Sequence, residues 1–187
     1  MRRHSSSIVL PGFLLLAAFA NAQEKAGGTS FKIGEGKIEL SAPTGWTKKQ
    51  PQNRIIEAEF ATPPAAGDEA PGRLTAMGAG GSIDSNIERW AGQFAGDNGA
   101  AGVPKRDKLT VSGCEVQIVD LSGTYKDAPG GPFAGGKTVM RDNYRMLGAI
   151  IQTKDAGNYF LKLYGPKATI DAAEKDFQNM VKNLKVK

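Results

Sequence analysis

The residues best suited to chemistry lie together in one short stretch, residues 85 to 94, at helical spacing. They are Asn86, Arg89, Trp90 and Gln93. A guanidinium presents a planar fork of N–H donors that fits a carboxylate, and neighbouring amides add further donors and acceptors. This group is therefore a candidate site for a carboxylate or peptide group of a ligand or protein partner.

The same stretch also has a structural interpretation. At 100° per residue, Trp90 lies in the apolar stripe of a helix, and Asn86, Arg89 and Gln93 form a narrow polar stripe beside it. From there, Arg89 and Gln93 can reach backbone carbonyls of a neighbouring irregular segment, while Asn86 holds the turn before the helix. The sequence favours this brace, and both interpretations stay open.

Carboxylates supply the second candidate chemistry. His4 is the only histidine and lies in a segment that we expect to be removed, which excludes Ser-His-Asp triads and His-ligated metal sites from the mature chain. Acid–base hydrolysis by Glu57, Glu59 and Asp120 stays possible. Glu57 and Glu59 share one face of an expected strand, where paired acids are usually solubilising.

Two further motifs have simpler explanations. Cys114 is the only cysteine, so no internal disulfide forms, and its neighbours predict a buried, unreactive position in a strand. Residues 131 to 138, GPFAGGKT, match the phosphate-binding pattern GxxxxGK[ST], but turn residues precede them where a buried strand is required. We interpret 126 to 138 as a loop between strands, with Phe133 either contacting a partner or folding back onto the sheet.

The first 22 residues have the features of a secretory signal peptide. Arg2 and Arg3 precede an apolar run of 13 residues, and Ala20-Asn21-Ala22 provides an A-x-A cleavage site. The apolar run is shorter than the roughly 20 residues of a membrane-spanning helix. We therefore expect cleavage after Ala22, no membrane span after removal of the signal, and a periplasmic or secreted mature protein.

Charge constrains the partners only weakly. The 24 basic residues less Arg2 and Arg3 leave 22 against 19 acidic residues, a net charge of +3. The basic residues are scattered along the chain, whereas nucleic-acid binding needs several cations on one strip. We expect no nucleic-acid partner, no cofactor and no metal, and instead a protein or small-molecule ligand in the envelope.

The apolar patterning predicts an α+β fold, in which a mainly antiparallel β-sheet is packed by helices. The expected strands cover 31–33, 37–40, 54–60, 73–77, 107–111, 114–125, 143–153 and 158–164. The expected helices run from Ile83 to Ala95 and from about Ala168 to Leu184, each with one apolar stripe. Residues 23–30 form a short flexible leader, 62–72 an exposed hairpin loop, and 31–187 a single domain. Trp46, after a Pro-x-Gly turn, is expected to be buried.

Four stretches together resemble a group of exported bacterial proteins with an N-x-x-R-W-x-x-Q helix motif, whose core is similar to the PsbP-like fold. They are Asn86-x-x-Arg89-Trp90-x-x-Gln93, Pro43-x-Gly45-Trp46, Leu147-Gly148-Ala149-Ile150 and Phe160 to Pro166. The resemblance covers Phe31 to Leu184. It implies a PsbP-like α/β/α sandwich with a non-catalytic binding or accessory role, and it supplies no catalytic residue or metal ligand.

Three functions follow as hypotheses. The first is a non-catalytic binding or accessory protein outside the cytoplasm, which uses a face built by the first helix and the loops 62–72 and 126–138. The second is a periplasmic hydrolase built on carboxylates. The third is a structural envelope protein, which would self-associate.

Overall fold

The computed structural model describes residues 28–51, 53–96, 99–128 and 137–187. The expected signal peptide and Phe133 therefore lie outside the described residues. Within these ranges the chain forms, in order, β1 (Thr29–Ile33), β2 (Ile38–Ala42), β3 (Thr47–Lys49), β4 (Ala58–Ala61), β5 (Arg73–Ala79), α1 (Ile83–Gly92), β6 (Phe94–Ala95), β7 (Lys105–Val111), β8 (Cys114–Asp127), β9 (Val139–Gln152), β10 (Asn158–Pro166), α2 (Lys167–Lys182) and β11 (Lys185–Val186). Neither described helix is both long enough and apolar enough to cross a membrane.

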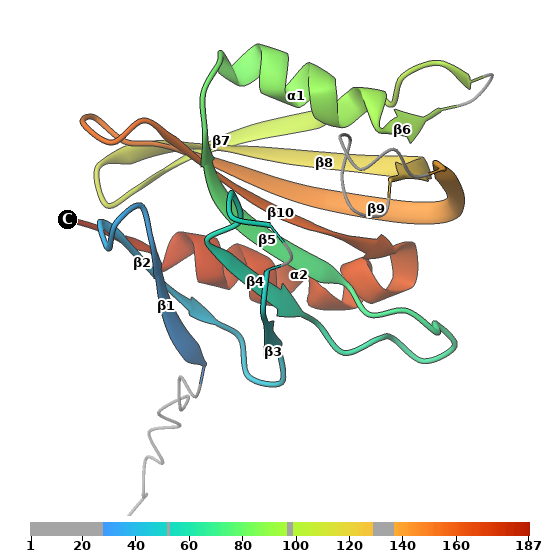
Figure 1. The fold of residues 1–187 in the computed structure, drawn as a ribbon, viewed down its shortest axis with the longest axis horizontal. Coiled ribbons are helices and arrows are strands. Elements are labelled where there is room, and N and C mark those ends of the chain that lie inside the picture. The colour runs from blue at the N-terminus through green and yellow to red at the C-terminus, as the bar shows by residue number, and fades with distance from the viewer. Residues whose placement is uncertain (1–27, 52, 97–98, 129–136) are drawn as a thin grey trace, which may run out of the picture.

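One large sheet of eight strands forms the centre of the molecule (Figure 1). Its order is β3-β4-β5-β10-β9-β8-β6, and β7 also pairs with β8. The strands pair antiparallel throughout, and a smaller antiparallel sheet joins β1, β2 and β11. This arrangement confirms the mainly antiparallel α+β fold predicted from the sequence.

The two helices cover opposite faces of the large sheet. Alternation along β10 separates two apolar cores: Phe160 packs with α1 on one face, and its neighbour Leu161 packs with α2 on the other. On the first face, the ring of Trp90 meets that of Phe160 edge to face, with 5.8 Å between centroids. The layers are therefore helix, sheet and helix, which is the sandwich that the resemblance implied.

Helix α1 begins where the sequence predicted and ends earlier. The Ser82 hydroxyl caps it by accepting a hydrogen bond from the Ser85 N–H at 3.1 Å. The helix ends at Gly92 and not at Ala95. Phe94 and Ala95 instead form β6 and pair with β8, Phe94 opposite Tyr125. Side-chain periodicity could not reveal this end, because Phe94 is buried in either conformation.

The expected strand over 54–60 is wrong in its first half, since β4 begins only at Ala58. The Asn53 side chain accepts a hydrogen bond from the Ile56 N–H at 3.2 Å, which favours a turn over an extended strand. The hairpin at Ser112-Gly113 is as predicted, with positive φ at both residues.

Two expectations about individual residues are confirmed, because Trp46 and Cys114 are both buried.

The Trp90 side chain of α1 packs against the backbone of Gly148 on β9. A Cβ atom at this position would lie 2.5 Å from Cζ3 of the Trp90 ring. The indole therefore fills the space that a side chain would occupy, and only 3% of Trp90 is exposed. Because packing this close leaves the indole ring no other position, Gly148 fixes where α1 lies on the sheet.

A methyl group at this contact tests how firmly the ring is held. We expect Gly148→Ala to lower the free energy of unfolding by about 1–3 kcal/mol, because the added methyl group must displace the Trp90 indole. Gly92→Ala is the matched control, since a Cβ atom there meets nothing within 4 Å. Urea unfolding of both variants gives the comparison, and equal stabilities would show that α1 is not positioned by this contact.

Candidate functional site

The first predicted residue, Asn86, is a structural brace. It is buried, and its amide donates hydrogen bonds to the carbonyls of Gly80 at 3.1 Å and Ser82 at 2.8 Å. Its oxygen accepts a hydrogen bond from Arg89 at 2.6 Å. Asn86 therefore holds the turn before α1, as the structural interpretation of this stretch predicted.

The other predicted residues have different partners in the structure. Among the described residues, Arg89 bonds to Asn86 and Gln93 bonds to a lysine, and neither meets the backbone carbonyls that the brace interpretation predicted. Trp90 is buried on Gly148, so its ring is not available to a partner. The oxygen of Gln93, the C-cap residue of α1, accepts its hydrogen bond from Lys162 Nζ at 2.5 Å.

Lys162 on β10 is the functional candidate that the sequence analysis missed. It is half-buried on the α1 face, between Phe160 and Tyr164 along the strand. Its Nζ lies 4.6 Å from the ring centroid of Tyr164 and 5.0 Å from that of Tyr125, and it donates a hydrogen bond to the Tyr125 hydroxyl at 3.3 Å. Aromatic faces attract a cation at this range.

We name Lys162, Gln93, Tyr125 and Tyr164 the lysine–tyrosine cluster. Its aromatic part extends further, because the Tyr144 ring stacks on that of Tyr125 with 5.9 Å between centroids. A signal for this site did exist in the sequence, since Phe160 and Tyr164 flank Lys162 at i±2 and place it on an aromatic strand face.

Two arginines stand near the cluster and change its electrostatics. Burial, and then repulsion by Arg73 and Arg89, lower the pKa of Lys162 to about 7, whereas Asp127 acts in the opposite direction. Burial also raises the pKa of Tyr125. The pKa of Lys162 therefore lies well below that of an exposed lysine, and Tyr125 stays neutral.

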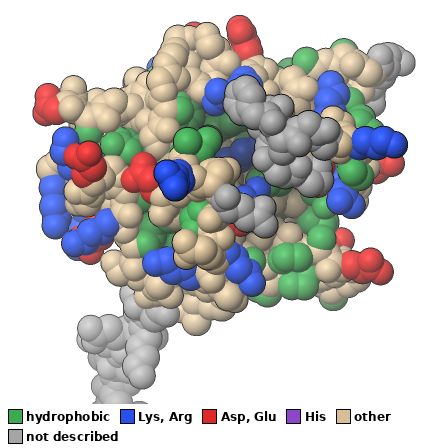
Figure 2. All heavy atoms as spheres, in the orientation of Figure 1, with side chains coloured by type: hydrophobic (Ala, Val, Ile, Leu, Met, Phe, Trp, Pro, Cys, Tyr) green, Lys and Arg blue, Asp and Glu red, His purple; other side chains and the backbone are tan. Residues whose placement is uncertain are grey.

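Arg73 is itself paired with an acid. It makes two hydrogen bonds to Glu59, at 2.8 and 2.9 Å, and a third to the Tyr164 hydroxyl at 2.7 Å. Figure 2 shows that acidic and basic side chains are otherwise spread over the visible surface and do not gather into one patch.

The three candidate catalytic carboxylates do not come together. Glu59 on β4 bonds to Arg73 on the α1 face, whereas Asp120 on β8 bonds to Arg145, which also meets α2 on the opposite face. Four strand spacings separate β4 from β8, about 19 Å. Paired catalytic carboxylates in glycoside hydrolysis lie within about 10 Å of each other.

The third carboxylate, Glu57, is also engaged, because it accepts hydrogen bonds from the N–H groups of Gly34 and Gly78. Among the described residues, no three His, Cys, Asp or Glu side chains gather as metal ligands would.

The loop 62–72 does not share a face with α1, which corrects the predicted binding surface. Asp68 in this loop accepts hydrogen bonds from the Thr169 N–H at 3.0 Å and the Thr169 hydroxyl at 2.6 Å, at the start of α2. The N-cap residue of α2 is Pro166, whose side chain makes no capping bond. Asp68 thus supplies the cap, and its charge suits the positive end of the helix.

The structure is similar to that of the cyanobacterial PsbP protein CyanoP from Synechocystis, with a TM-score of 0.52 at 10% identity over 84% of this chain and 91% of that one. The fold is PsbP-like. The Ran-binding protein Mog1p of Saccharomyces cerevisiae is similar too, with a TM-score of 0.50 at 12% identity over 85% of this chain and 95% of that one.

A further similar structure is LpqN, involved in cell envelope biogenesis of Mycobacterium tuberculosis, with a TM-score of 0.49 at 12% identity over 87% of each chain. No family model and no curated protein sequence matches this chain. The PsbP-like fold class predicted from the sequence is thereby confirmed, and identities this low establish the fold alone.

Removing the buried charge tests the electrostatics of the site. In the unfolded chain the pKa of Lys162 is near 10.4, so between pH 7 and pH 10 the unfolded state binds more protons than the folded state. Below pH 7 the folded protein therefore bears the full cost of the buried charge, and this cost disappears towards pH 10. We expect Lys162→Met to exceed the wild type in unfolding free energy by about 1 kcal/mol or more at pH 6, with the gain shrinking towards pH 10.

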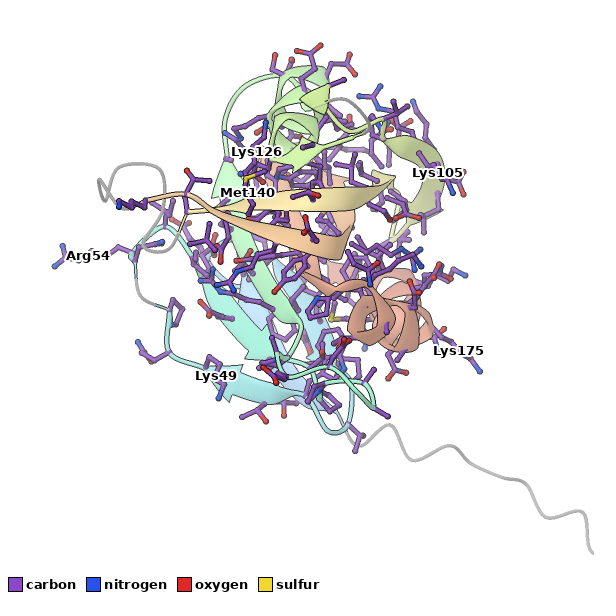
Figure 3. The ribbon with its side chains drawn as sticks, turned by 90° about the vertical axis from the view of Figure 1, so that its right-hand side faces the viewer. Lys49, Arg54, Lys105, Lys126, Met140 and Lys175 are labelled. Carbon is purple, nitrogen blue, oxygen red and sulfur yellow. The ribbon has the colours of Figure 1, made fainter. Side chains whose placement is uncertain are left out.

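Urea unfolding across this pH range measures the difference. Lys175→Met is the control, because Lys175 is exposed and projects from α2 away from the sheet (Figure 3). A gain for Lys162→Met that does not change with pH would show that the ammonium is not desolvated in the folded protein.

Proposed function

We propose that the protein is a non-catalytic binding protein that works outside the cytoplasm, and that its binding site is the lysine–tyrosine cluster beside the end of α1. Lys162 carries this proposal. Its ammonium is enclosed by two rings and one amide, and none of the described carboxylates contacts it. A desolvated charge of this kind lowers stability, and such groups concentrate at functional sites.

The fold and the sequence support this assignment. Mog1p, which has the same fold, is a Ran-binding protein, so the fold is compatible with a binding role. The basic residues, apolar run and A-x-A site at the start of the chain support export. The hydrolase alternative lacks support from the geometry, because Glu59 and Asp120 are ion-paired on opposite faces of the sheet.

Photo-crosslinking in the native envelope, followed by pull-down and mass spectrometry, tests the binding role. We expect the partner or ligand to be lost from Lys162→Met and from the double variant Arg89→Ala, Gln93→Ala, because both remove donors and acceptors at the cluster. Lys175→Met removes a lysine elsewhere and should retain the partner. Melting temperatures recorded in parallel separate lost binding from lost folding. If folded cluster variants keep every partner of the wild type, the site lies elsewhere.

The location is tested separately from the site. We expect cell fractionation to recover the protein outside the cytoplasm, with an N-terminal sequence that begins at Gln23, because Ala20-Asn21-Ala22 directs cleavage after Ala22. A cytoplasmic protein that keeps residues 1–22 would contradict the proposal that it acts outside the cytoplasm.

A further inference from the structure

The positive charges at the lysine–tyrosine cluster exceed the negative charges that contact them. The charged groups near Lys162 and their partners are Arg89 on α1, Arg73 on β5, Glu59 on β4, Asp127 on β8 and Arg141 on β9. Glu59 is committed to Arg73 by two hydrogen bonds, and Asp127 lies 3.4 Å from Arg141. Of the cations in this set, Lys162 and Arg89 are the two that no described carboxylate contacts.

Both cations keep donors for another acceptor. An ammonium has three N–H donors, and the described residues accept two of them, at Gln93 and Tyr125. A guanidinium has five, and within the described ranges Asn86 accepts one from Arg89. Each cation is thus anchored by an amide of the same helix stretch, and this pre-positions the remaining donors.

The tyrosines place uncharged aromatic rings beside these donors. Burial raises the pKa values of Tyr125 and Tyr144, so both hydroxyls stay neutral near neutral pH. The rings of Tyr125 and Tyr164 lie 5.1 Å apart between centroids. A ligand at this site would meet both fixed N–H donors and aromatic carbon.

We propose that Lys162 binds the carboxylate of a small organic acid, whose apolar part lies against the tyrosine rings, and that Arg89 adds positive charge to the site. This inference rests on the proposed function, because it names the ligand class of the same site.

The end of α1 favours a carboxylate over a phosphate. Gln93 is the C-cap residue, and Lys126 Nζ donates to the Gly92 carbonyl at 3.2 Å, so the carbonyl end of the helix borders the cluster. A helix C-terminus carries partial negative charge, which disfavours a dianion. Phosphate sites instead use the N–H groups of helix N-termini. A monoanion with an organic body suits these surroundings better.

Binding of such a ligand is coupled to a proton. A ligand carboxylate stabilises the ammonium, so the pKa of Lys162 rises above its value of about 7 in the free protein. Above pH 7 the ligand must bind together with a proton. Its affinity then falls about tenfold for each unit of pH until the pKa of the bound form is reached.

Benzoate is the probe, and benzamide is its uncharged control of the same shape. Calorimetry on the exported protein measures their affinities, and NMR of the lysine Nζ groups follows the pKa of Lys162. We expect benzoate to bind at pH 6.5, to raise the pKa of Lys162 and to lose affinity about tenfold per unit above pH 7. Benzamide and inorganic phosphate should bind at least about tenfold more weakly, because benzamide lacks the charge and phosphate lacks an apolar part to lie against the tyrosine rings.

The variants connect the binding to the two cations. Lys162→Met should abolish benzoate binding, Arg89→Met should weaken it at least about tenfold, and Lys175→Met should leave it unchanged. Binding that survives Lys162→Met, matches that of benzamide, is weaker than that of phosphate or ignores pH would overturn the carboxylate assignment.

Absence of benzoate binding to the wild type overturns the assignment as well. In that case, loss of the envelope partner from Lys162→Met would still support the proposed binding role, so the two proposals fail separately.

Discussion

The contact between the Trp90 indole and the bare backbone of Gly148 determines where the candidate site forms. Gly148 lies directly opposite Lys162 in the pairing of β9 with β10. The indole therefore enters the sheet next to the lysine, and this brings the last turn of α1 within reach of β10. In that last turn, Gln93 meets Lys162 Nζ. One missing side chain thus sets the geometry of both the packing and the polar cluster.

A cation on each face of the sheet has different partners, and its pKa shifts in the opposite direction. On the α2 face, Arg145 bonds to three carboxylates, Asp120, Asp171 and Glu174, which raise its pKa. On the α1 face, Lys162 has an amide, a hydroxyl and two rings as partners, and its pKa falls. A fully paired cation suits a structural role, whereas an underpaired one is open to a further anion. The difference in partners, not in burial alone, distinguishes the site from the scaffold.

Sequence patterning predicted the helices, most hairpins, the buried positions of Trp46 and Cys114, and the role of Asn86 before α1. It failed at Asn53, where a local hydrogen bond favours a turn, and at the end of α1, where Phe94 is buried in either conformation. It also failed for Lys162, because a lysine in an alternating strand normally faces solvent. Whether such a position is covered depends on a helix that crosses it from elsewhere in the chain. That information is tertiary, and so is the connection between loop 62–72 and α2.

The bond from Asp68 to the start of α2 joins residues that are 101 positions apart in the chain. A helix whose N-terminal cap comes from its own sequence can begin as an isolated segment, but α2 lacks such a cap. Its first turn gains full stability only after the β4–β5 hairpin has brought Asp68 into place. Closing so long a loop carries an entropic cost, and a native state rich in distant contacts is reached slowly. The first turn of α2 therefore depends on a distant part of the chain, the β4–β5 hairpin, for its cap.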